Sequence, residues 1–85
     1  MTHITVNCAG LETKDQLHSH LAHAMAFPDW YGANLDALYD CLTDLDEDVH
    51  LHLAGWEQLP DWKAAFAAVL DDAENDCDEF TVSYE

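Results

Sequence analysis

Three short segments of this chain alternate apolar and polar residues, and this alternation limits the possible folds more than any other feature. The segments cover residues 3–8, 49–54 and 80–84. A period of two predicts β-strands with one buried and one exposed face. Strands covered on both faces read instead as continuous apolar runs, so we expect helices on one face of the sheet only.

The stretches between the strands carry apolar residues at helical spacing. The first opens with a capping box from Thr13 to Gln16 and should end before Pro28, since a residue preceding proline is pushed out of the helical region. The second should begin after Asn34 as its N-cap, and the third should have Pro60 in its first turn. The expected buried faces are Leu17, Leu21, Ala24 and Met25, then Leu35, Leu38, Leu42 and Leu45, and finally Trp62, Phe66, Val69 and Ala73.

The order strand, helix, helix, strand, helix, strand favours parallel pairing through right-handed crossovers. With every crossover on the same face, each strand adds beyond the last. The predicted fold is therefore an α/β two-layer sandwich, in which a three-stranded parallel sheet of order 1-2-3 carries the helices on one face. At 85 residues the chain has room for a single domain, residues 1–85, and the stretch 56–59 is too short to assign.

Acidic residues dominate the composition. Eighteen Asp and Glu stand against Lys14 and Lys63, with no arginine, which gives a net charge of −16. Such a charge repels nucleic acid and anionic membranes and attracts basic partners over a long range. It also keeps a protein soluble without any partner, so composition alone leaves both interpretations open.

The cysteines and the apolar runs indicate the cellular compartment in which the protein is expected. Cys8, Cys41 and Cys77 are an odd and sparse set for a secreted disulfide scaffold, so we expect reduced thiols. No apolar run approaches the ~20 residues of a membrane span, and no export signal is visible. We therefore expect a cytoplasmic protein with no cofactor, no metal and no membrane association.

Three aspartates form a row on the second predicted helix. Asp36, Asp40 and Asp44 follow one another at i, i+4 and i+8, opposite the leucine face. Each like-charge pair at this spacing costs an isolated helix about 0.2–0.5 kcal/mol, and no lysine lies between Asp29 and Asp48 to relieve it. The row thus indicates a cationic partner, with a purely solvated face as the alternative.

Aromatic residues lie beside this row. Trp30, Tyr31 and Tyr39 next to charges are typical of a binding hot spot, although Trp30 or Tyr31 could instead close the core over the loop. We expect one of these two to be structural. In the third helix, Asp71 lies opposite the apolar face and could supply another carboxylate, but an isolated exposed aspartate rarely matters.

Residues 27–43, Phe-Pro-Asp-Trp-Tyr-Gly-Ala-Asn-Leu-Asp-Ala-Leu-Tyr-Asp-Cys-Leu-Thr, resemble the loop-and-helix signature of the barstar family of ribonuclease inhibitors. The similarity is long and nearly free of gaps, and a weaker similarity extends over the whole chain, including Cys77-Asp78 before the last strand. The predicted topology is also the family's. The resemblance implies a protein that is not an enzyme and whose loop and second helix enter a nuclease active site, where acidic side chains occupy phosphate subsites.

Position by position, the resemblance also implies the contact residues. Asp36 and Asp40 match the two principal helix carboxylates of the family, with Asp40 the central one. Trp30 stands where the family commonly has tyrosine, Tyr39 where it has tryptophan, and Asp71 where barstar has glutamate. The expected partner-binding residues are Trp30, Gly32, Asn34, Leu35, Asp36, Tyr39, Asp40, Asp44 and Asp71.

The implied partner is a basic extracellular or toxin-type ribonuclease, bound by a monomer in a 1:1 complex. The alternative is an acidic nucleic-acid mimic or adaptor that binds a basic protein unrelated to nucleases. The family's Gly-Trp after the second helix is replaced by Asp44-Leu45, and the segment around Trp56 is shorter than in barstar. The partner therefore need not be barnase itself.

Other chemistries are disfavoured. His18 and the histidines at 20 and 23 do not share one helix face and have no evident fourth ligand, so we interpret them as surface residues. Residues 44–55 lack the glycine and the glutamate of a calcium loop. An exposed row of carboxylates offers no cleft that would split their pKa values, and Cys41 lies near the buried side of its helix, so we expect no catalysis.

Overall fold

Three parallel strands form the sheet in the computed structural model, which describes residues 1–85. The strands are β1 (Thr2–Asn7), β2 (Val49–Ala54) and β3 (Phe80–Tyr84), and they pair in the order β1-β2-β3. Ile4 lies opposite Leu51, and Leu51 lies opposite Val82, so the inward-pointing apolar residues stand side by side across the sheet. The predicted order 1-2-3 is confirmed.

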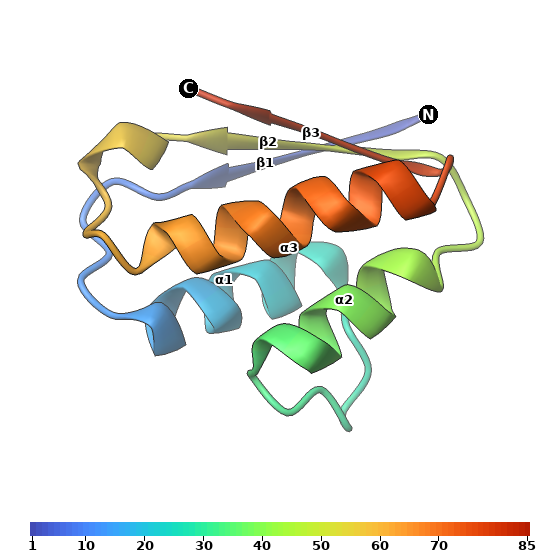
Figure 1. Cartoon of the computed structure of the whole chain (residues 1–85), viewed down its shortest axis with the longest axis horizontal. Helices are drawn as coiled ribbons and strands as arrows, with labels where there is room; N and C mark the ends of the chain where they lie inside the picture. Colours follow the sequence, from blue (N-terminus) through green and yellow to red (C-terminus); the bar gives the residue numbers. More distant parts are fainter.

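Three helices cover one face of this sheet (Figure 1). They are α1 (Lys14–Met25), α2 (Leu35–Thr43) and α3 (Lys63–Asp76), and a short 3₁₀ helix, η1 (Trp56–Gln58), follows β2. The short helix α2 runs at an angle to α3 and packs against it at the side of the helical layer away from the sheet (Figure 1). The α/β two-layer sandwich expected from the alternating strands is therefore confirmed.

Both predicted N-caps are present. The Thr13 hydroxyl accepts a hydrogen bond from the Gln16 backbone N–H at 3.2 Å, and the Gln16 side chain accepts one from the Thr13 backbone N–H at 3.1 Å, which completes the capping box. At α2, Asn34 Oδ1 accepts from the N–H of Ala37 at 2.8 Å. Helix α1 ends before Pro28, as expected, with Ala26 in the left-handed region at φ 53°.

The core lies between the inner face of the sheet and the helices. Full burial of an aliphatic or aromatic side chain contributes roughly 1.5–3 kcal/mol, so this layer supplies most of the folding free energy. Its largest fully enclosed side chains are Leu17 and Leu21 of α1, Leu38 and Leu42 of α2, Phe66 and Leu70 of α3, and Leu51, Leu53 and Phe80 of the sheet.

The structure corrects several predicted boundaries. Strand β1 covers residues 2–7 instead of 3–8, and Leu45 follows α2 as a half-buried residue instead of ending its helical face. Pro60 precedes α3 and is not in its first turn. Its carbonyl accepts a hydrogen bond from the N–H of Lys63 at 3.1 Å, a tight i to i+3 turn that leads into the helix.

The apolar face of α3 is also centred differently from the prediction. Phe66 and Ala73 are buried as expected, but Leu70 is fully enclosed, whereas Trp62 and Val69 are only half-buried. Leu70 lies four residues after Phe66 and three before Ala73, so these three positions share one helical stripe. The helix presents that stripe to the sheet.

One donor on the outer edge of β3 is bonded by a side chain of α3. The backbone N–H of Glu85 donates to the carbonyl of Leu53 in β2 at 3.0 Å. Successive residues of a strand direct their backbone groups alternately to its two sides. The N–H of Val82, three residues before Glu85, therefore points to the open side of β3. That N–H donates to a carboxylate oxygen of Glu74 at 2.8 Å.

A helix that crosses a membrane needs about 20 apolar residues, and none of the helices described here has that length and apolarity.

Candidate functional site

The predicted acidic row lies on the exposed side of α2. Asp36, Asp40 and Asp44 are all exposed, and Asp44 forms the C-cap of the helix. None of them has a lysine or histidine within ion-pairing distance, since the only contact of that kind joins His52 and Glu85. Asp36 is favoured by the positive end of the helix dipole, but Asp40 and Asp44 have no local compensation.

The loop before α2 separates its two aromatic residues. The N–H of Tyr31 donates to the carbonyl of Pro28 at 3.0 Å, and the Tyr31 ring packs on Phe27 with 4.9 Å between the ring centroids. Burial raises the pKa of Tyr31 to about 12. Trp30 is 62 % exposed, one of two large apolar side chains left in solvent. The expectation that one of the two aromatics is structural is confirmed, and that residue is Tyr31.

His18 anchors Tyr31 and is not a surface residue, which corrects the sequence-based interpretation. It is only 3 % exposed, its Nδ1 lies 2.5 Å from the Tyr31 hydroxyl, and its ring lies 4.6 Å from that of Phe66. Burial lowers the pKa of His18, so the imidazole is neutral at pH 7 and its Nδ1 can accept a hydrogen bond from the Tyr31 hydroxyl. Phe66 lies 48 positions away in the sequence, so helical periodicity gave no sign of this packing.

Gly32 and Asn34 shape the entry into α2. The Asn34 side chain accepts from Ala37 through its oxygen and donates to the Gly32 carbonyl at 3.4 Å through its nitrogen. A Cβ on Gly32 would lie 2.9 Å from that nitrogen, and Ala33 already adopts a left-handed φ of 51°. Both residues therefore fix the backbone that carries the acidic row.

Tyr39 joins α2 to α3 at the centre of a second group of carboxylates. Its hydroxyl donates a hydrogen bond to the carboxylate of Asp76 on α3. This hydrogen bond is the largest cause of a raised pKa at Tyr39, followed by partial burial and the charges of Asp76, Asp72 and Asp40. Carboxylates from two helices thus surround one phenol.

Sequence reasoning missed the contribution of α3 to this group. It selected Asp71, whereas the structure brings Asp72 and Asp76 to Tyr39. Their i, i+4 spacing repeats that of the α2 row and was the available signal. Asp71 is exposed and accepts a hydrogen bond from the Tyr84 hydroxyl at 3.0 Å, so it lies toward β3, and its contact with a partner stays a prediction.

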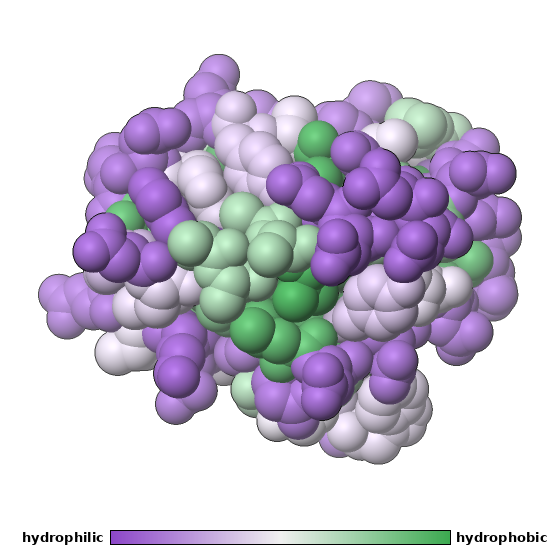
Figure 2. All heavy atoms as spheres, viewed as in Figure 1, coloured by the Kyte–Doolittle hydropathy of each residue, from purple (hydrophilic) through white to green (hydrophobic).

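A shallow cleft of about 280 Å³ opens next to the loop. Asn34 and Leu35 form one wall, the start of α1 a second, and Trp62 and Phe66 of α3 a third. Figure 2 shows apolar residues in this region of the helical side, surrounded by hydrophilic ones. Two of the predicted contact residues, Asn34 and Leu35, therefore line the only cleft in the structure.

The site contains no reactive thiol and no metal-ligand cluster. Cys8, Cys41 and Cys77 are free and buried, and burial raises the pKa of Cys41, which favours an unreactive thiol over a thiolate. No group of three or more His, Cys, Asp or Glu side chains is arranged to hold a metal ion. The exposed chemistry of this surface consists of carboxylates and aromatic rings.

Comparison with known proteins extends the resemblance of residues 27–43 to the whole chain. Residues 1–85 match the protein family described as "Barstar (barnase inhibitor)". A protein of Bacillus subtilis (strain 168) named "Putative ribonuclease inhibitor YrdF" is 46 % identical over 43 residues. That match covers 51 % of this chain and 47 % of the Bacillus protein, so the similar region spans about half of each.

Proposed function

Because the chain belongs to the barstar family, we propose that it inhibits a basic ribonuclease by placing carboxylates of α2 in the cationic active site of that enzyme. The family is described as an inhibitor and the Bacillus relative is named as one, so the expected role is binding without catalysis. The cognate enzyme is a toxin-type or extracellular ribonuclease, held in a 1:1 complex.

One observation carries this proposal: the α2 row has no cation of its own. Asp36, Asp40 and Asp44 are exposed, close together and unpaired in the free protein. An active site that binds RNA presents lysine or arginine side chains to successive phosphates, and three carboxylates one helical turn apart offer a matching series of negative charges. Binding to a cationic active site would relieve the repulsion within the row.

The surroundings of the row support a defined contact area. The exposed Trp30 lies at one end of α2, and the Tyr39 group adds Asp72 and Asp76 from α3. The cleft beside Asn34 offers a place for an apolar side chain of the partner. An aromatic anchor, a pocket and unpaired charges are the features that concentrate binding energy in an interface.

The direct test isolates the partner and measures RNA cleavage. The tagged protein is used to co-purify its ligand from the native host, and the ligand is then assayed on RNA with and without equimolar inhibitor. We expect a small basic ribonuclease whose activity falls in stoichiometric proportion to the added protein. Isolation of a basic protein that cleaves no RNA would replace this proposal with the acidic adaptor.

A further inference from the structure

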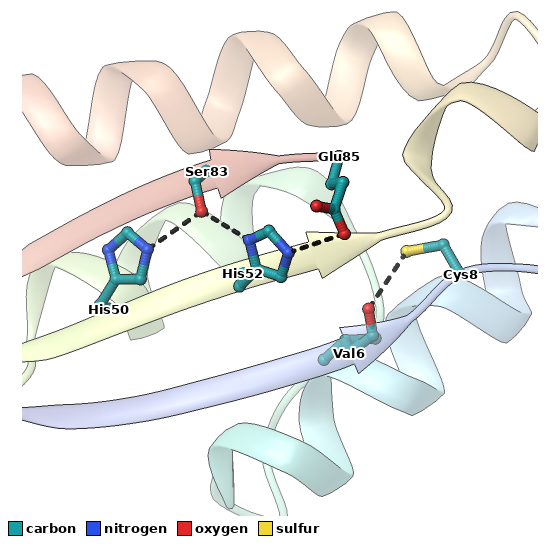
Figure 3. A network of polar contacts seen from close by, with 6 residues as sticks. All are labelled: Val6, Cys8, His50, His52, Ser83 and Glu85. Atoms are coloured by element: carbon teal, nitrogen blue, oxygen red, sulfur yellow. Dashed lines mark hydrogen bonds and ion pairs between the residues drawn. The ribbon is translucent and has the colours of Figure 1, made fainter.

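The face of the sheet opposite the helices carries a pair of histidines that the proposed inhibitory surface does not use. His50 and His52 alternate along β2 with buried apolar residues, so both point away from the helical layer. Alternate Cα atoms of a strand lie about 6.6 Å apart, close enough for two imidazole rings to converge on one point. Ser83 of β3 lies between the two rings (Figure 3).

The two rings direct one nitrogen each at the same atom. Nε2 of His50 lies 3.0 Å and Nδ1 of His52 lies 2.7 Å from Oγ of Ser83. A serine hydroxyl donates one proton, so it can satisfy only one of the two nitrogens when both carry lone pairs. Two imidazole nitrogens are thus held on either side of a single polar position.

From this convergence we propose that His50 and His52 bind a divalent transition-metal ion, with Zn²⁺ as the reference case, between Nε2 of His50 and Nδ1 of His52. Neutral imidazole nitrogen is a preferred ligand of Zn²⁺, Ni²⁺ and Cu²⁺, whereas Mg²⁺ and Ca²⁺ prefer oxygen. A Zn–N bond of about 2.0–2.1 Å is shorter than either contact with Ser83 Oγ, so the Ser83 hydroxyl turns away to admit the ion between the two nitrogens. With two protein ligands, its remaining positions are filled by water.

The outward nitrogens of both rings already have the partners that a ligating histidine needs. Nδ1 of His50 lies 2.7 Å from Oγ1 of Thr81, and Nε2 of His52 lies 3.5 Å from Oε1 of Glu85. Hydrogen bonds or close contacts on the far side of the ring fix the tautomer in which the inner nitrogen carries the lone pair. The carboxylate of Glu85 additionally makes the His52 ring a stronger donor to the metal.

The position of this pair separates metal binding from inhibition. The helices cover the other face of the sheet, so an ion at His50 and His52 leaves the α2 row free (Figure 1). The net charge of −16 raises the local concentration of any cation at the surface, and Mg²⁺ serves to measure that unspecific contribution.

Calorimetric titration of the purified protein with Zn²⁺ at pH 7.5 tests the proposal. We expect one binding site, with affinity lowered about tenfold or more in His50→Gln and in His52→Gln, and about tenfold in Glu85→Gln. His3→Gln is the matched control. His3 lies on the same face opposite His50, with 5.7 Å between the ring centroids, and its loss should change the affinity less than threefold.

Ring-proton NMR spectra and thermal melts complete the test. Zn²⁺ should shift the ring signals of His50 and His52, while Mg²⁺ at the same concentration leaves them in place, and melts show that each variant is folded. Equal losses in His3→Gln and His50→Gln, or equal binding of Mg²⁺, would overturn the assignment. Inhibition of the ribonuclease is measured separately in the same variants and should stay at the wild-type level.

Discussion

The hydroxyl of Tyr31 lies 2.5 Å from Nδ1 of the buried His18, so a neutral imidazole of α1 holds the loop that presents Trp30. Burial keeps the pKa of His18 below its usual value of 6.5. In the unfolded chain the same side chain takes up a proton near pH 6.5, which stabilises that state relative to the folded one. The contribution of neutral His18 to stability is therefore present above pH 6.5 and is lost as the pH falls below it.

The first prediction compares His18→Gln with the wild type across pH. Glutamine does not titrate, so between pH 7 and pH 5 the wild type should lose more stability than His18→Gln. The acidic residues are the same in both proteins, so their effect on the free energy of unfolding cancels in the comparison. Urea unfolding at each pH gives the two curves. His20→Gln, an exposed position on the same helix, should reproduce the wild-type slope. Parallel curves for wild type and His18→Gln would show that the imidazole is not desolvated.

A second prediction distinguishes two aspartates of equal charge, Asp40 in the α2 row and Asp46 in the connection after it. Asp40→Ala would leave cationic groups of the enzyme unmatched and should raise the dissociation rate, with a loss of about 2 kcal/mol or more, roughly 30-fold in Kd. Asp46→Ala should alter mainly the association rate by a modest factor. Both variants should melt like the wild type, because both side chains are exposed. Equal, small effects in stopped-flow kinetics would leave only diffuse charge as the basis of binding.

Salt dependence gives the third prediction. A net charge of −16 attracts a basic enzyme over a long range. Salt screens this attraction beyond about 10 Å at 0.1 M ionic strength. The association rate constant should fall by about tenfold or more between low and high salt, while the dissociation rate constant changes less. Stopped-flow mixing over a series of salt concentrations measures both. An association rate constant that does not change with salt would exclude steering.

The fourth prediction concerns the two loop aromatics. Trp30→Ala should leave the Tm unchanged, since that side chain is 62 % exposed, and should weaken binding about tenfold or more. Tyr31→Ala removes the ring that packs on Phe27 and contacts His18, and should cost about 2 kcal/mol of stability, or roughly 8–16 °C in Tm. Calorimetric melts and binding titrations separate the two effects. A destabilised Trp30→Ala would mean that both rings are structural.

A fifth prediction concerns the thiols. Burial raises the pKa of both Cys8 and Cys41, and Cys77 is also buried, so all three should react with a thiol reagent far more slowly in the native protein than in urea. Adding a reductant should leave the Tm unchanged, as should treating the purified protein with a chelator, because we expect neither a structural disulfide nor a structural ion. A drop of several degrees in either case would contradict this account of the core.

Local patterns in the sequence were sufficient for most of the fold. The alternation in residues 3–8, 49–54 and 80–84 predicted three strands with one covered face, and the caps at Thr13 and Asn34 placed two helix starts. Parallel strands need crossovers of one hand, so few topologies remained. The start of α3 was missed because the tight turn after Pro60 depends on how the chain leaves η1, which local pattern does not specify.

The candidate site was less accessible to sequence reasoning. The acidic row on α2 follows from helical spacing, and the structure leaves it exposed and unpaired. Three other arrangements join residues that are far apart in the chain: His18 against Phe66, Tyr39 against Asp76, and His52 against Ser83. Each depends on the packing of one element on another, and a pattern within a single element contains no information about that packing.

The carboxylate that Glu74 places on the N–H of Val82 has a consequence for self-association. A three-stranded parallel sheet leaves two edges where a strand from another molecule could add, the route by which many β-proteins aggregate. At β3, an added strand would have to displace a charged hydrogen-bond acceptor and bring its own carbonyl beside Glu74 and the neighbouring Asp71. A carboxylate of α3 thus occupies one backbone donor on the outer edge of β3, which disfavours the addition of a further strand there.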